Sequence, residues 1–204
     1  MSVVWMDGVL GDMSRVVVGL DLSLTHTGVG VVSESGQKIC FEIVPKRTGF
    51  GRTIWIRDTI TDRLQEFERV TAFAIEGYSF GSVGRSIYDI GELGGLVKAK
   101  FYEEGSAVWL VPPSVVKKFA TGKGNATKEM VVDALNAMRG WCEWSEFGAP
   151  FEYKRNNEVD ALFLALILSY KTFKSSRPIS LSQLSRERQD MIAELESKCS
   201  ILTM

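Results

Sequence analysis

Hydrophobic residues near the start of the chain fall into short runs rich in β-branched side chains, a pattern typical of strands. The stretch VVVGLDLSLTHTGVGVV, residues 16–32, holds two such runs separated by small and hydroxyl-bearing residues. A third run, KICFEIV, follows Ser33–Gly36, whose serines and glycine suit a turn. The pattern predicts three consecutive strands in an antiparallel meander.

From residue 50 onward, segments with helical spacing alternate with short apolar runs. In the first such segment the residues at roughly helical spacing among charged ones are Ile54, Ile56, Ile60, Leu64 and Phe67. The elements predicted after the meander are a helix in RTIWIRDTITDRLQEFERV, a strand in VTAFAIEGYS, a helix in SIYDIGELGGLVKAKFYEEG, a strand in AVWLV that stops at two prolines, and helices in ATKEMVVDALNAM and NNEVDALFLALILSYKTF. Residues 139–155, rich in aromatic residues and glycine, are expected to form a long loop.

This order predicts an α/β fold: a mixed five-stranded sheet, with the antiparallel meander first, flanked by helices. The chain of 204 residues suits one domain, which we place at residues 15–174. Residues 1–14 are expected to be an N-terminal extension. After Lys174 the composition becomes polar and charged, so residues 175–204 are expected to form a linker and a peripheral C-terminal helix.

Composition narrows the class of protein without deciding its function. Hydrophobic residues make up 45% and charged residues 24%, as in an ordinary globular protein with a core. The longest apolar run, ALFLALIL, is too short to span a bilayer, and no leader for secretion is visible. Three distant cysteines match neither a zinc site nor a disulfide framework, which favours a reducing, cytoplasmic location. A net charge of −1 neither favours nor excludes nucleic acid as a partner.

Three acidic residues lie where apolar segments begin or end: Asp21, Glu76 and Asp160. A carboxylate near a core costs several kcal/mol unless it is paired, protonated or bound to a cation. No lysine or arginine next to them in sequence is an obvious buried partner, whereas one shared divalent cation would compensate all three. Oxygen ligands suit Mg²⁺ or Mn²⁺ rather than zinc. Taken singly, each residue has an alternative role, as a turn cap or as a favourable charge at a helix N-terminus.

Five segments, in order, resemble the RuvC-type Holliday junction resolvases, especially phage-encoded ones, within the RNase H-like nuclease superfamily. The resemblance covers about residues 15–170. It rests on the first strand with its acid and Gly-rich neighbour, the strand ending in FAIEGYSFG, the Gly-spaced helix in YDIGELGGLV, the lysine-bearing segment SVVKKFATGKGNATKEMV, and the closing helix in NNEVDALFLAL. Each segment is a weak signal alone, and the shared order makes the set fairly specific.

The resemblance implies an RNase H-like fold, a homodimer and a metal-dependent endonuclease that cuts branched DNA, with two Mg²⁺ or Mn²⁺ ions per active site. Asp21, Glu76 and Asp160 correspond to the family's metal ligands. The family commonly has a fourth acid or a histidine three residues before the last aspartate, where this chain has Asn157, followed by Glu158. Asn157 is better placed on a regular helix, but Glu158 is the better ligand, so we expect Glu158 to serve.

The expected DNA contacts are basic and aromatic side chains around the acidic cluster. By resemblance, Lys117 and Lys128 lie near the scissile phosphate. The loop GYSFGSVGRS, after Glu76, offers aromatic rings that can stack on exposed bases, although one ring could instead fill the core. The candidate DNA-binding residues are Lys117, Lys118, Lys123, Lys128, Tyr78, Phe80 and Arg85, with Lys154 and Arg155 also nearby, and some of these charges could be ordinary surface charge.

Other interpretations of the same residues stay open. An actin-like ATPase or sugar kinase shares the Asp-led hairpin, but this chain lacks a second such hairpin, so no nucleotide cofactor is expected. A branched-DNA-binding relative with weak or no cleavage is compatible with the change at Asn157. A nuclease acting on RNA/DNA hybrids, forks or flaps is compatible as well. No membrane partner is expected.

Overall fold

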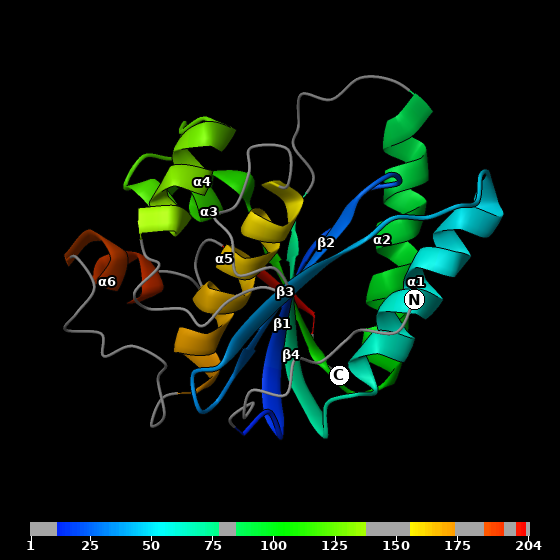
Figure 1. The fold of residues 1–204 in the computed structure, drawn as a ribbon, viewed down its shortest axis with the longest axis horizontal. Coiled ribbons are helices and arrows are strands. Elements are labelled where there is room, and N and C mark those ends of the chain that lie inside the picture. Colours follow the sequence, from blue (N-terminus) through cyan, green and yellow to red (C-terminus); the bar gives the residue numbers. More distant parts are fainter. Residues whose placement is uncertain (1–11, 78–84, 138–155, 174–185, 194–198, 203–204) are drawn as a thin grey trace.

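The computed structural model describes residues 12–77, 85–137, 156–173, 186–193 and 199–202. The strands among these residues form one mixed sheet (Figure 1). The first three, β1 (Arg15–Asp21), β2 (Thr27–Ser33) and β3 (Lys38–Ile43), make the predicted antiparallel meander. β4 (Arg69–Glu76) runs parallel to β1, and β5 (Ala107–Val111) runs parallel to β4. The strand order is β3-β2-β1-β4-β5-β6.

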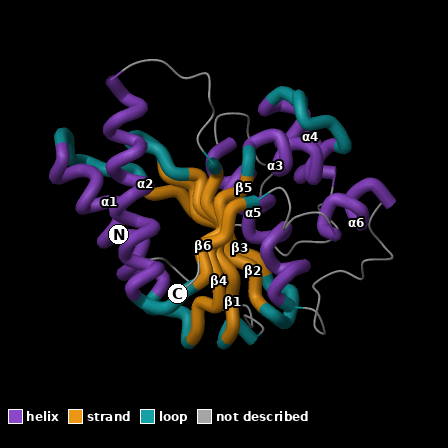
Figure 2. Tube along the Cα trace, turned by 180° about the vertical axis from the view of Figure 1, so that it is seen from behind, coloured by secondary structure: helices purple, strands orange, loops and turns teal. Residues whose placement is uncertain are grey.

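Helices cover both faces of this sheet. On one face lie α1 (Phe50–Leu64) and α2 (Arg85–Glu103), and on the other lies α5 (Asn156–Thr172) with α3 (Pro113–Thr121) and α4 (Lys128–Ala137) around it. Figure 2 shows the sheet between these two groups. The α/β class predicted from the sequence is confirmed. Among the described residues, no helix has the length and apolar character needed to cross a membrane.

Alternation along β1 decides which side chains meet which helices. Val16, Val18 and Leu20 pack into the core beneath α1 and α2. Val17 packs into the second core, which contains most of α5. Because side chains two apart in a strand share a face, Asp21 projects toward the α5 side of the sheet.

Three glycines let α5 lie directly against the backbone of β1 and β2. A Cβ atom at Gly19 would come within 2.1 Å of the carbonyl oxygen of Ala161, and one at Gly30 within 2.6 Å of the same group. At Gly28 a Cβ atom would come within 2.0 Å of the carbonyl oxygen of Asn157. Any side chain at these positions would push the helix away, so the Gly-rich second strand seats α5.

The structure adds two elements to those predicted. Within the described residues the sheet has six strands rather than five, because β6 (Ser200–Leu202) pairs antiparallel with β5. The segment expected to be only a linker and helix therefore also supplies a strand, after the helix α6 (Arg186–Ala193). The division into an extension, a nuclease domain and a tail stays a prediction.

The second addition is α3, which the sequence analysis missed. The two prolines after β5 were expected only to stop the strand. Pro113 instead opens the helix, where its missing N–H costs nothing, and Gly122 ends it with a φ of 81°. On α6, Arg188 donates hydrogen bonds to the carbonyl oxygens of Phe119 (2.7 Å) and Ala120 (2.5 Å), at the end of α3.

Candidate active site

Two of the three predicted acids end neighbouring parallel strands. In the pairing of β1 with β4, Leu20 lies opposite Ile75, so the next residues, Asp21 and Glu76, are also neighbours. Both project toward the α5 side, since Val17 on β1 and Ala74 on β4 belong to the core beneath that helix. The carboxyl ends of two central strands thus place two carboxylates side by side.

The third acid, Asp160, comes to the same place through the seating of α5. Gly28 is the pairing partner of Asp21 on β2, and the backbone of Asn157 lies directly on Gly28. The first turn of α5 therefore lies over the end of β1, and this turn carries Asp160. Sequence positions 21, 76 and 160 meet at one edge of the sheet because two strands end there and a helix begins there.

The pKa values show that these carboxylates interact. Burial, followed by the charges of Glu76 and Asp160, raises the pKa of Asp21 well above its ordinary value. Burial and the charge of Asp160 raise the pKa of Glu76 to about 7, and burial raises the pKa of Asp160 to about 6. The protein holds three acids in a place where their ionised forms are destabilised, which is a frequent property of functional sites.

Two lysines oppose these shifts. Lys128, the first residue of α4, lowers the pKa of all three acids, although its own side chain is exposed. Lys117, on α3, lowers the pKa of Glu76 and Asp160. Thr127 accepts a hydrogen bond from the backbone N–H of Met130 (3.4 Å) and caps the start of α4. The two lysines expected near the scissile phosphate therefore lie within electrostatic reach of the acids.

The acids carry only oxygen donors, which suits Mg²⁺ or Mn²⁺ better than zinc. In the part of the chain that the structure describes, however, no set of three or more acidic, histidine or cysteine side chains is arranged to hold a metal ion as it stands. The donor chemistry fits a hard divalent cation. Such a cation would compensate the negative charge of the three carboxylates, which burial and proximity make costly.

The other predicted residues are more scattered. Glu158 is buried on α5, with 1% of its surface exposed. It is not among the charges that shift the pKa values of Asp21, Glu76 and Asp160, which are the acids themselves, Lys117 and Lys128. Lys118 and Lys123 are exposed on α3 and on the loop after it. Arg85 is the first residue of α2. Four residues, Tyr78, Phe80, Lys154 and Arg155, lie outside the described residues.

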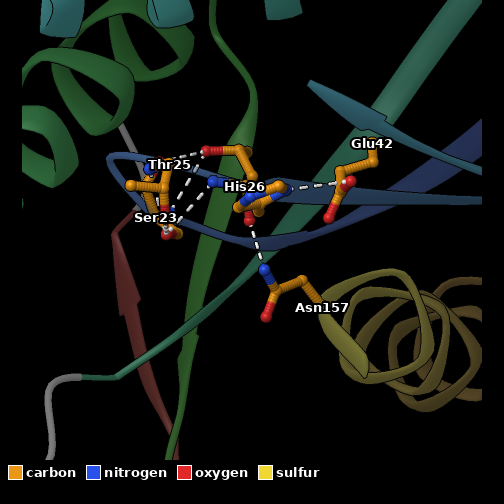
Figure 3. Close-up of polar contacts among 6 residues, drawn as sticks. Ser23, Thr25, His26, Glu42 and Asn157 are labelled. Carbon is orange, nitrogen blue, oxygen red and sulfur yellow. Dashed lines mark hydrogen bonds and ion pairs between the residues drawn. The ribbon is translucent and has the colours of Figure 1, made fainter. Parts of the chain in front are cut away.

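A polar contact beside the acids was missed by the sequence analysis. The side-chain amide of Asn157 donates a hydrogen bond to the backbone carbonyl oxygen of His26, in the turn between β1 and β2 (Figure 3). His26 Nδ1 also lies 3.1 Å from Glu42 Oε2 on β3. These partners are distant in sequence, so only the register of the sheet and the seating of α5 reveal them.

Comparison with known proteins decides the family. Residues 17–139, more than half of the chain, match the family model described as crossover junction endodeoxyribonuclease RuvC. The chain belongs to the RuvC family. This confirms the resemblance seen in the sequence and the enzyme class that it implied. Asp21, Glu76, Lys117 and Lys128 lie within the matched residues, and Asp160 lies beyond them.

Individual RuvC proteins agree with this assignment. RuvC of Thermus thermophilus is 29% identical over 174 residues, which cover 80% of this chain and 99% of the relative. RuvC of Treponema denticola is 27% identical over 130 residues, or 61% of this chain and 72% of the relative. The solved structure of T. thermophilus RuvC superposes with a TM-score of 0.60 at 27% identity, covering 80% of this chain and 99% of that one.

A more distant structure shows the fold alone. The yeast mitochondrial Holliday junction resolvase Ydc2 is 14% identical, with a TM-score of 0.51 over 90% of this chain and 81% of its own. The RNase H-like fold expected from the sequence is thus confirmed.

Proposed function

We propose that this protein resolves four-way DNA junctions by hydrolysing phosphodiester bonds at the site formed by Asp21, Glu76 and Asp160. The observation that carries the proposal is the convergence of these three partly buried carboxylates next to Lys117 and Lys128, with pKa values raised by burial and, for Asp21 and Glu76, also by neighbouring acids. Membership of the RuvC family supports the reaction class. Other branched structures, such as forks and flaps, belong to the same substrate class.

Nucleases of this family generally depend on divalent metal ions. In this chain Asp21, Glu76 and Asp160 would hold Mg²⁺ or Mn²⁺, and we propose two ions per site, with Glu158 as a further ligand. When bound, such ions supply charge neutralisation at the scissile phosphate and an activated water. Asp21 is the natural central ligand, because it projects from the strand that lies between β2 and β4.

The lysines are proposed to hold DNA by its phosphates. Lys128 stands at the N-terminus of a ten-residue helix, where backbone N–H groups and the helix dipole also favour a phosphate. Lys118 and Lys123 extend this positive surface with exposed side chains. The T. thermophilus RuvC solved in complex with a Holliday junction substrate has a TM-score of 0.60 with this chain, which supports the same kind of substrate. Stacking by Tyr78 and Phe80 and a phosphate contact by Arg85 stay predictions.

A four-way junction is symmetric, so resolving it requires two matched cuts. A homodimer with two-fold symmetry would present two copies of the site to one junction, and we propose this assembly. We also propose a cytoplasmic location, since the three cysteines of the sequence match neither a zinc site nor a disulfide framework.

Cleavage of defined substrates tests the proposal. The protein is incubated with a labelled four-way junction, a linear duplex and an RNA/DNA hybrid, in Mg²⁺, Mn²⁺ or EDTA. We expect paired nicks in the junction that require metal and disappear in Asp21→Asn. Asp62→Asn, an exposed residue of α1, is the matched control and should cut like the wild type.

Each alternative gives a different result in this assay. Tight junction binding without cleavage would favour a non-catalytic relative. Preferential cutting of the hybrid would move the substrate class to RNA. Metal-independent cleavage, or cleavage that survives Asp21→Asn, would refute the assigned site.

A further inference from the structure

A polar contact joins the first turn of α5 to the sheet. Asn157 lies there, and its side-chain amide donates to the carbonyl oxygen of His26 (Figure 3). The assignment of amide nitrogen and oxygen follows from the partner, because a carbonyl can only accept a hydrogen bond. The backbone of the same residue rests on Gly28, where no Cβ could fit. Asn157 therefore touches the end of β1 and the start of β2 through both its side chain and its main chain.

The turn that offers this carbonyl is itself held firmly. Ser23 Oγ accepts hydrogen bonds from the backbone N–H groups of Thr25 (3.3 Å) and His26 (3.4 Å). The hydroxyl of Thr27 donates to the carbonyl oxygen of Ser23 (2.7 Å), and the side chain of Thr27 is buried. His26 is also fixed to β3 by the contact of its imidazole with Glu42. A loose turn would not hold α5 in place, whereas this turn can.

We propose that Asn157 is a positioning residue: its amide ties α5 to the turn between β1 and β2, and so sets Asp160 against Asp21. The inference rests on the proposed function in that these acids form the active site. Asp160 follows Asn157 by one helical turn, so a shift of this turn moves the carboxylate with it.

Asn157 and Glu158 are neighbours on the first turn of α5, and each is a candidate to contribute to the site. Asn157 lies on the face of α5 that also carries Asp160, which made it a candidate ligand from helical spacing. Its amide nitrogen donates to His26, which ties the residue to the turn between β1 and β2. The adjacent Glu158 is the other oxygen-bearing candidate on this turn.

The variant Asn157→Asp separates a positioning role from a ligand role, because the two roles predict changes of opposite sign. An aspartate has no N–H to donate, and its charge would face the carbonyl of His26. In EDTA, we expect the melting temperature to fall by about 4–8 °C. We also expect at least about a tenfold rise in the Mg²⁺ concentration needed for half-maximal thermal stabilisation, because Asp160 is displaced. Asn157→Ala, which removes the donor without adding charge, should move both quantities in the same direction by less.

A ligand role gives the reverse result. An added carboxylate would strengthen a metal site, so Asn157→Asp would need less Mg²⁺ for half-maximal stabilisation than the wild type. Unchanged melting in EDTA for both Asn157 variants would also overturn the proposal. Asn125→Asp, an exposed asparagine in the loop before α4, is the control for the added charge and should melt like the wild type in EDTA.

Junction cleavage provides the third measurement. At saturating Mg²⁺ and junction, we expect kcat for both Asn157 variants to fall at least about tenfold, with junction affinity nearly unchanged, since Lys117 and Lys128 stay in place. Wild-type kcat in both variants would contradict a positioning role. If the wild type cuts no junction, the proposed function fails, whereas the melting and metal titrations still decide the role of Asn157.

Discussion

Replacing Glu76 with glutamine should make the metal-free protein more stable at alkaline pH. Burial and the charge of Asp160 raise the pKa of Glu76 from its ordinary 4.5 to about 7. Between these two pH values, the unfolded chain has released a proton that the folded protein still holds. Unfolding is therefore increasingly favoured as pH rises through this window, and the loss of stability is complete above about pH 7.

The size of this effect follows from the two pKa values. At ~1.36 kcal/mol per pH unit between them, keeping Glu76 ionised in the folded state costs on the order of 3 kcal/mol at pH 8. At pH 4 the cost is close to zero, because the acid is largely protonated in both states. Part of the cost belongs to the coupled acids together, since Asp160 and Asp21 share it.

Urea unfolding in EDTA measures the difference. Wild type, Glu76→Gln and Glu68→Gln are compared at pH 4 and pH 8. Glu68 is exposed before β4, at the end of that strand opposite Glu76, so its variant controls for the loss of one charge. We expect Glu76→Gln to gain about 3 kcal/mol over the wild type at pH 8 and little at pH 4. Glu68→Gln should gain little at either pH.

Equal effects of Glu76→Gln at the two pH values would refute the reasoning, since they would mean that Glu76 ionises normally in the folded protein. Metal provides a second check, because it should narrow the difference between the variant and the wild type. Mg²⁺ at about 100 times its dissociation constant should stabilise the wild type by about 2.7 kcal/mol and the variant by less.

Three further outcomes are expected from other parts of the site. Gly30→Ala should lower stability by several kcal/mol, because its Cβ would collide with α5. Gly51→Ala, in open space on α1, should instead raise stability by up to about 1 kcal/mol. Urea unfolding of both variants measures the difference. Lys128→Ala should move the acidic limb of the pH–rate profile for junction cleavage to higher pH, because this lysine lowers the pKa of all three acids. Lys118→Ala is the control and should leave the limb in place. An unmoved limb in Lys128→Ala would contradict the prediction. Arg188→Ala should destabilise the protein by about 1–3 kcal/mol and speed hydrogen exchange in α3, and unchanged exchange there would show that α3 does not depend on this contact.

The main features of the fold were accessible from the sequence because they depend on local patterns. One apolar strand ends in Asp21 and another ends in Glu76, so the sequence alone places both acids at strand ends. Their meeting required only that the two strands be parallel neighbours. Asp160 was harder to place, because its position depends on α5 lying on Gly19, Gly28 and Gly30, which the sequence showed only as a Gly-rich strand.

The features that the sequence did not reveal depend on contacts between distant segments. The role of Asn157 depends on a carbonyl at His26, and no local pattern marks a backbone acceptor. β6 is three residues long, too short for a period to be recognised, and it becomes a strand only because β5 offers an open edge. α3 is short and begins with a proline, so its start resembled the end of a strand.

The pairing of β6 with β5 also bears on how the protein behaves in solution. β5, with the sequence AVWLV, is uncharged and rich in residues that favour strands, and such an edge readily pairs with another chain. β6 covers this edge with residues from the end of the chain, although none of the candidate catalytic residues lies there. A version shortened after α5 would retain every acid of the site and still expose a strand prone to aggregation. β6 therefore shields an edge that would otherwise favour association between chains.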